Sequence, residues 1–137
     1  METEGTLVDS NVILDVLTGD TEWEGWSSAA LAHAADEGPL VINPIVFAEV
    51  SVRFKTPADA DAALPESVFR RDPLPYGGGF LAGKAFARYR RRGGARVTPL
   101  PDFYIGAHAA HQGLVLLTRD ARRYRTYFPG VTLVAPA

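Results

Sequence analysis

The sequence Thr-Leu-Val-Asp-Ser-Asn at residues 6–11 is a short apolar run that ends abruptly in a carboxylate, Asp9. Apolar residues with helical spacing follow at once, at Val12, Ile13, Val16 and Leu17. A strand that turns directly into a helix is typical of open α/β sheets, in which ligands bind at the carboxyl ends of the strands. Asp9 is therefore the first candidate for a functional residue.

Composition indicates an ordinary globular protein. The chain has 137 residues, of which 47% are apolar and 22% are charged, so we expect residues 1–137 to form one domain. It has no cysteine, which excludes disulfides and thiolate metal sites. The acidic N-terminus and the lack of a long apolar run argue against a signal peptide and a membrane span, so we expect a soluble, cytoplasmic protein.

Acidic and basic residues are separated along the chain. Residues 1–52 contain ten Asp or Glu and no Lys or Arg, whereas residues 53–137 contain all fourteen Lys and Arg and six acids. Such asymmetry is typical of a chain that binds a polyanion. Two oppositely charged solvated faces on one domain would produce the same pattern, and charge alone leaves both interpretations open.

Apolar strands and helices alternate along the chain. Strands are predicted at residues 6–9, 40–43, 114–117 and 131–134, and helices at 10–18, 22–36, 44–52, 56–64, 80–92 and 102–112. In the helix at 80–92, five residues are predicted to face inward: Phe80, Leu81, Ala85, Phe86 and Tyr89. The segment 65–79, rich in proline and glycine, is predicted to be an irregular loop, with Gly77-Gly78-Gly79 as flexible chain. Strands that are apolar throughout predict a parallel sheet covered on both faces.

Four carboxylates occupy similar positions relative to these elements. Asp9 ends the first strand, Glu49 interrupts an apolar helix, Asp102 begins a helix and Asp120 follows the strand at 114–117. Each has a structural explanation of its own, as a helix cap or as part of a solvated stripe, but four such coincidences are less favoured than one site. Clustered carboxylates without His or Cys suit a hard cation such as Mg²⁺ or Mn²⁺, which lowers the pKa of a bound water and stabilises displacement at phosphorus.

Four segments, in order, resemble the PIN-domain nucleases, and specifically the VapC-like toxins of bacterial toxin–antitoxin pairs. They are Leu-Val-Asp-Ser-Asn-Val-Ile-Leu-Asp (7–15), Asn-Pro-Ile-Val-Phe-Ala-Glu-Val (43–50), Leu-Pro-Asp-Phe-Tyr-Ile-Gly-Ala-His-Ala (100–109) and Leu-Leu-Thr-Arg-Asp (116–120). The resemblance implies an α/β/α sandwich with a central parallel sheet. It also implies a metal-dependent endoribonuclease that leaves 5′-phosphate and 3′-hydroxyl ends.

Carried over by position, the resemblance implies a catalytic quartet that holds Mg²⁺ or Mn²⁺, made of Asp9, Glu49, Asp102 and Asp120. It implies that three polar residues support the metal site: Ser10, Asn11 and Thr118. The partners implied are an RNA substrate, a second copy of the chain in a homodimer, and a cognate antitoxin that blocks the site with a basic side chain. No membrane is implied.

Basic residues gather in two segments, from Lys84 to Arg96 and from Arg119 to Arg125. RNA must reach an acidic metal site, so we predict that the arginines beside Asp120 contact phosphates, namely Arg119, Arg122 and Arg123. The first segment ends a predicted helix, where cations also stabilise the helix dipole, and both interpretations stay open for it.

Other functions fit the residues less well. A phospho-accepting regulatory domain would need an acidic pair after the first strand and a late lysine, but the last lysine is Lys84. A phosphatase with a nucleophilic Asp would need a second Asp where Asn11 stands. His108 and His111 lack further ligands and are interpreted as packing or surface residues. The alternative that remains is a PIN fold kept for binding or regulation without catalysis.

Overall fold

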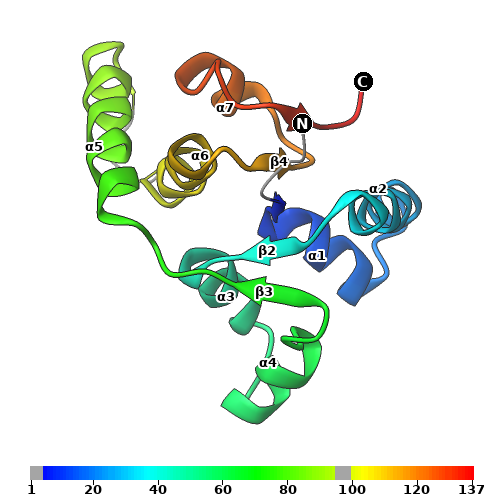
Figure 1. The fold of residues 1–137 in the computed structure, drawn as a ribbon. Coiled ribbons are helices and arrows are strands. Elements are labelled where there is room, and N and C mark those ends of the chain that lie inside the picture. The colour runs from blue at the N-terminus through cyan, green and yellow to red at the C-terminus, as the bar shows by residue number, and fades with distance from the viewer. Residues whose placement is uncertain (1–4, 95–99) are drawn as a thin grey trace.

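The computed structural model describes residues 5–94 and 100–137, which form a five-stranded parallel sheet with helices around it (Figure 1). The strands are β1 (Thr6–Val8), β2 (Leu40–Ile42), β3 (Phe69–Arg71), β4 (Val115–Leu117) and β5 (Leu133–Val134). The helices are α1 (Ser10–Thr18), α2 (Glu24–Glu37), α3 (Pro44–Ser51), α4 (Pro57–Ala63), α5 (Tyr76–Arg91), α6 (Leu100–Gln112) and α7 (Arg122–Tyr127).

The strand order is β3-β2-β1-β4-β5, so the chain first moves outward from β1 in one direction and later crosses to the other side of it. Right-handed crossovers place α1 to α4 on one face of such a sheet and α5 to α7 on the other, which is the expected α/β/α sandwich. Figure 1 shows β3, β2 and β4 one above another, with α5 and α6 side by side at the left. The direction of winding reverses between β1 and β4, and a crevice for ligands forms at the carboxyl ends of the strands at such a point.

The neighbouring strands β1 and β2 are buried on both faces. Leu7, Val8 and Val41 are fully excluded from solvent, which explains why these strands are apolar throughout instead of alternating. A polar residue that caps the next helix follows each strand: Asp9 accepts from the N–H of Ser10, and Asn43 begins α3. Polar side chains are thereby brought to the carboxyl edge of the sheet.

The prediction of an irregular loop at residues 65–79 is wrong. Phe69–Arg71 forms β3, an edge strand that pairs with β2, and α5 begins at Tyr76. The glycines are helical, and they let α5 approach α6 closely, because a Cβ on Gly77 would collide with the ring of His111. Gly78 is buried in the same contact between the two helices. A Cβ added to it would lie 3.6 Å from the Cα of His108.

The inward face of α5 agrees with the prediction at Ala85, Phe86 and Tyr89, which pack in or against the core, but differs from it at the start of the helix. Phe80 and Leu81 are exposed, by 66% and 37%, because the buried face is built from small residues, Gly78, Ala82 and Ala85. The remaining helix and strand boundaries agree with the predictions within two residues, except that the basic segment after Asp120 forms α7, which was not expected as a helix. Arg96 lies outside the described residues. None of the helices that the structure describes is long and apolar enough to cross a membrane.

Candidate active site

Asp9 lies at the point where the winding of the sheet reverses, directly after β1, and is only 5% exposed. Its Oδ1 accepts a hydrogen bond from the backbone N–H of Ser10 (2.8 Å). Its Oδ2 accepts from the hydroxyls of Thr118 (2.9 Å) and Tyr124 (3.0 Å). Burial raises the pKa of the Asp9 carboxyl to about 6, although the two hydroxyl donors oppose the rise.

Polar side chains hold the ends of β1 and β4 together. Thr118 directly follows β4 and is fully buried, with the amide of Asn11 3.4 Å from its hydroxyl. The carbonyl of the Asn11 side chain accepts the backbone N–H of Arg119 (3.1 Å), and the Thr118 hydroxyl accepts the backbone N–H of Asp120 (3.1 Å). These contacts hold the loop after β4, including the backbone of Asp120, against α1.

Two further acids reach the same edge from different helices. Glu49 is on α3, where its Oε1 accepts a hydrogen bond from the Ser10 hydroxyl (2.8 Å). Asp102 is in the first turn of α6, and its Oδ2 accepts a hydrogen bond from Nη1 of Arg123 (2.6 Å). The supporting position predicted for Ser10 therefore corresponds to a direct contact with one of the acids.

The carboxylates are close enough to repel one another. Besides burial, repulsion from Asp102 and Glu49 contributes to the raised pKa of Asp9. Burial likewise raises the pKa of Glu49, with a contribution from Asp102, and the pKa of Asp102, with a contribution from Asp120 that Arg123 opposes. The structure thus brings the four predicted acids together at one edge of the sheet, with Asp9 deepest and Asp120 exposed.

The chemistry of this set fits a hard divalent cation. All four side chains offer oxygen ligands, and a cation among them would offset the burial and repulsion that raise the pKa values of Asp9, Glu49 and Asp102. In residues 5–94 and 100–137, no three such side chains are arranged closely enough to hold a metal ion as they stand. Three of the acids are instead held by neighbours: Asp9 by Thr118 and Tyr124, Glu49 by Ser10 and Asp102 by Arg123.

The family model of the PIN domain matches residues 6–129, which include all four acids. This chain belongs to the PIN-domain family. No curated relative matches it.

Solved structures with a similar fold cover almost the whole PIN domain. A VapBC2 complex from Rickettsia felis bound to a promoter DNA fragment has a TM-score of 0.74 at 16% identity, covering 96% of this chain and 98% of that chain. FitAcB from Neisseria gonorrhoeae has a TM-score of 0.68 at 19% identity, covering 93% and 95%. A toxin–antitoxin complex from Klebsiella pneumoniae has a TM-score of 0.65 at 24% identity, covering 97% and 98%. At these identities the likeness shows the fold.

The three arginines predicted to contact RNA have different surroundings in this PIN domain. Arg119 is bound to the buried carboxylate of Asp15 by two hydrogen bonds (2.9 and 3.1 Å), and its guanidinium lies over the ring of Trp23. Arg123 is paired with Asp102, whereas Arg122 is exposed. Contact with RNA stays a prediction for all three, but Arg119 already has a structural partner.

Sequence analysis missed Tyr124 and Asp15 as parts of this network. Tyr124 is 2% exposed and donates to Asp9, and its signal was an aromatic residue inside a basic segment, three residues after Ala121. Asp15 is 3% exposed and also accepts from the Ser27 hydroxyl (2.7 Å). The sequence feature that could have indicated Asp15 is a carboxylate on the buried side of an otherwise apolar helix.

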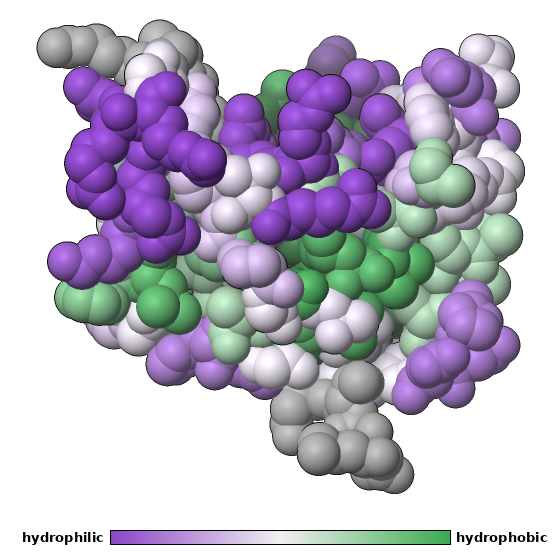
Figure 2. All heavy atoms as spheres, turned by 90° about the horizontal axis from the view of Figure 1, so that it is seen from above, coloured by the Kyte–Doolittle hydropathy of each residue, from purple (hydrophilic) through white to green (hydrophobic). Residues whose placement is uncertain are grey.

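A pocket of about 590 Å³ opens beside the acids. It is lined by Tyr89, Asp120, Arg122, Arg123, Thr126 and Tyr127. Two arginines lie over the Tyr127 ring: Arg88, in the last turn of α5, and Arg92, which directly follows that helix. Figure 2 shows hydrophilic side chains gathered over this end of α5, at the left of the view, and further ones across the middle of the same face. An exposed acid and several cations therefore share this side of the molecule.

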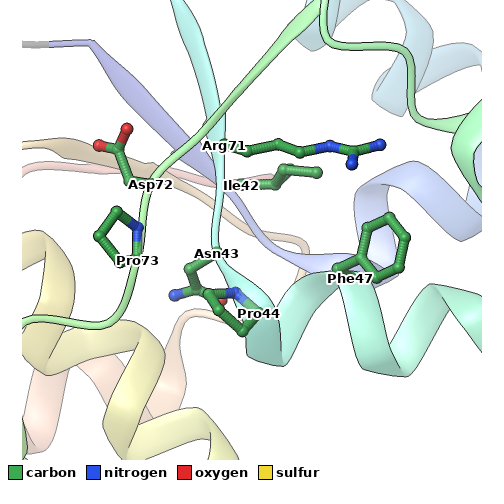
Figure 3. Close-up of a pocket in the computed structure, with 7 residues that line it drawn as sticks. All are labelled: Ile42, Asn43, Pro44, Phe47, Arg71, Asp72 and Pro73. Carbon is green, nitrogen blue, oxygen red and sulfur yellow. The ribbon is translucent and has the colours of Figure 1, made fainter.

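A second hollow, of about 420 Å³, lies at the carboxyl ends of β2 and β3 and contains none of the four acids. It is lined by Ile42, Asn43, Pro44, Phe47, Arg71, Asp72 and Pro73 (Figure 3). Figure 3 shows the Arg71 side chain extended alongside Ile42, and its guanidinium lies 4.9 Å from the centre of the Phe47 ring.

His108 lies on the inner side of α6 and is fully buried. Its Nδ1 is 3.0 Å from the amide nitrogen of Asn43, and its Nε2 is 2.8 Å from Oε1 of Gln112. These partners satisfy a neutral ring that accepts at Nδ1 and donates at Nε2, and burial lowers the pKa of His108. The interpretation of His108 as a packing residue is confirmed.

Proposed function

We propose that this PIN domain is a Mg²⁺- or Mn²⁺-dependent endoribonuclease that acts as the toxin of a toxin–antitoxin pair. The observation that carries the proposal is the burial of Asp9 at the ligand-binding point of the sheet, with Glu49 and Asp102 close enough to raise its pKa. A buried carboxylate with further carboxylates close to it destabilises a protein unless the group serves a cation or a proton. Membership of the PIN family supports the first use.

Asp9, Glu49, Asp102 and Asp120 would hold the cation. When bound, such a cation lowers the pKa of a water and stabilises the charge that develops on a phosphate. Thr118 and Tyr124 orient Asp9, Ser10 orients Glu49, and Asn11 fixes the loop that carries Asp120. A carboxylate of this set would accept the proton of the attacking water, and arginines of α7 would contact the phosphate.

RNA as the substrate is supported by the basic side of the molecule. The C-terminal end of α5 and all of α7 carry cations around the pocket that contains Asp120. Arginines bind phosphate oxygens through paired N–H donors, and an acidic cation site needs such neighbours to attract a polyanion. The same arrangement would bind a single strand across the pocket between α5 and α7.

An antitoxin partner is supported by the structural neighbours, which include complexes of a toxin with its antitoxin. In a pair of this kind, a basic side chain of the antitoxin would occupy the acidic cluster and compete with the cation. We further propose that the chain is a single domain and forms a homodimer, in line with its resemblance to VapC-like toxins.

The proposal is tested by cation binding and by RNA cleavage on the same samples. Thermal unfolding is followed in EDTA and in increasing Mg²⁺ or Mn²⁺ for the wild type, Asp9→Asn and Asp36→Asn, and cleavage of a mixed-sequence single-stranded RNA is measured under the same conditions. Asp36 is an exposed acid on α2 and serves as the matched control. We expect the cation to stabilise the wild type and Asp36→Asn by a few degrees and Asp9→Asn much less.

Cleavage is expected from the wild type and from Asp36→Asn only when the cation is present, and loss of Asp9 is expected to abolish it. Cation-dependent cleavage that survives in Asp9→Asn would contradict the assignment of the site. A wild type that neither responds to cations nor cuts RNA, but binds RNA or an antitoxin, would support a PIN fold kept for binding alone.

A further inference from the structure

Arg123 places a positive charge of the chain itself on one of the four acids. Its Nη1 lies 2.6 Å from Oδ2 of Asp102. A guanidinium and a divalent cation that both approach Asp102 compete for the same carboxylate and repel each other. The structure therefore describes an acidic cluster that is partly neutralised from within.

The pair between Arg123 and Asp102 is easily separated. The two side chains are 36% and 35% exposed, and ion pairs this accessible to water contribute little to the stability of a protein. The nearby pair of Arg119 with Asp15 is different, because Asp15 is 3% exposed and accepts two hydrogen bonds from the arginine. Of these two arginines, Arg123 is the one that can leave its carboxylate at low cost.

The pocket beside the acids offers Arg123 an alternative position. Arg123 lines it together with Asp120 and Arg122, and its volume of about 590 Å³ lies in the range of small-ligand sites. The guanidinium carbon of Arg123 is 5.9 Å from the centre of the Tyr89 ring. Tyr89 packs edge-on against Phe103, with 5.6 Å between ring centres, so this wall of the pocket is held by the core.

We propose that this pocket binds a phosphodiester of the RNA next to the cation, and that Arg123 exchanges Asp102 for that phosphate when the cation binds. The inference rests on the proposed nuclease function. Without a divalent cation, Arg123 neutralises Asp102; with one, its planar donors face the phosphate, which they fit better than a lysine would. Cation binding and RNA binding are then coupled, because each favours the state in which Arg123 has left Asp102.

The test measures two affinities on the same variants. Mn²⁺ affinity is measured by calorimetry without RNA, and binding of a hydrolysis-resistant phosphorothioate oligoribonucleotide is measured by fluorescence anisotropy with and without Mn²⁺. The variants are Arg123→Ala, Arg123→Lys and Arg125→Ala. Arg125 is an exposed arginine of the same helix that does not line the pocket, so it controls for the loss of one charge.

Arg123→Ala is expected to bind Mn²⁺ roughly two- to fivefold more tightly than the wild type, since a competing ion pair is removed. With Mn²⁺ present it is expected to bind the oligonucleotide more weakly, with a salt slope lower by roughly 0.7, as for one lost phosphate contact. Arg125→Ala should change both affinities less, and Arg123→Lys should lie between the wild type and Arg123→Ala.

Weaker Mn²⁺ binding by Arg123→Ala would overturn the exchange, because it would mean that Arg123 holds Asp102 in place for the cation. Oligonucleotide binding equal to that of Arg125→Ala in Mn²⁺ would overturn the phosphate pocket. If the wild type bound no divalent cation at all, the proposed function itself would fail, and the two failures are thus told apart.

Discussion

Arg119 and Asp15 join the loop after β4 to the middle of α1. The guanidinium gives two hydrogen bonds to a carboxylate that is 3% exposed, through Nε (2.9 Å) and Nη2 (3.1 Å). The backbone N–H of Arg119 is also bound, to Oδ1 of Asn11. Arg119 directly precedes Asp120, so this pair helps to fix the position of the Asp120 backbone beside the other three acids.

Replacing Arg119 with alanine is expected to lower the free energy of unfolding by about 3 kcal/mol, because the buried charge of Asp15 loses its partner. Urea unfolding of the wild type, Arg119→Ala and the exposed-arginine control Arg122→Ala would measure the loss, and the control should stay within about 0.5 kcal/mol of the wild type. Equal stability of the two variants would mean that the pair contributes nothing to folding and that Arg119 is free to bind RNA.

The four acids could be predicted from sequence because each stands at a marked place, at a strand end, a helix start or inside an apolar helix. The donors that hold them could not. Tyr124 contacts Asp9 across 115 positions of the chain, and an aromatic residue inside a basic segment does not show which distant side chain it contacts. The pairing of Arg123 with Asp102 was hidden for the same reason, since an arginine beside an acidic site reads equally well as a phosphate contact.

The central strands of the sheet could be predicted from the sequence, whereas the edge strand β3 could not. β3 has one buried residue, Phe69, followed by two exposed arginines, so it lacks the apolar run that marks β1 or β4. The glycines in the first turn of α5 were predicted to be flexible chain, because glycine disfavours helices. In the structure they serve the contact with α6, which only the tertiary packing reveals.

Two helical glycines, one buried and one exposed, allow a matched comparison of how an added Cβ affects stability. A Cβ on Gly106, in the buried part of α6, would lie 2.5 Å from the ring of Phe128, whereas a Cβ on Gly83, in the exposed part of α5, meets nothing within 4 Å. Gly106→Ala is expected to destabilise the protein by about 1–3 kcal/mol through overpacking, and Gly83→Ala to stabilise it by about 0.5–1 kcal/mol. Thermal unfolding of both variants measures the signs, and a stable Gly106→Ala would show that the Phe128 ring can move aside.

Asn43 has two structural tasks, and its loss is expected to cost more than that of a simple helix cap. Its Oδ1 caps α3 through the N–H of Val46 (3.0 Å), and its amide nitrogen is the partner of the buried His108 Nδ1. Asn43→Ala should therefore lose about 3 kcal/mol, as a cap and a buried hydrogen bond together. Thr56→Ala, which removes only the exposed cap of α4, should lose about 1 kcal/mol. Similar losses in chemical denaturation would show that His108 finds another donor.

The raised pKa of Asp9 makes the stability of the cation-free protein depend on pH. An Asp in an unfolded chain has a pKa of about 3.9, and burial raises that of Asp9 to about 6 in the folded state. The folded state therefore holds the proton more tightly, so this contribution to stability is fully present below pH ~4 and is lost as the pH rises through about 6. Between pH ~4 and ~7.5 the wild type should lose about 3 kcal/mol relative to Asp9→Asn, which cannot ionise at this position.

The measurement is urea unfolding in EDTA across this range, expressed as the difference between the two proteins. Titrating groups that do not interact with Asp9 cancel in that difference, including His108, whose pKa burial lowers. Adding Mg²⁺ or Mn²⁺ at pH 7.5 should restore much of the lost stability to the wild type and little to Asp9→Asn, because the cation binds the ionised carboxylate. A difference that stays flat with pH would mean that Asp9 ionises as easily in the folded protein as in the unfolded chain, and that the hydroxyls of Thr118 and Tyr124 fully compensate its burial.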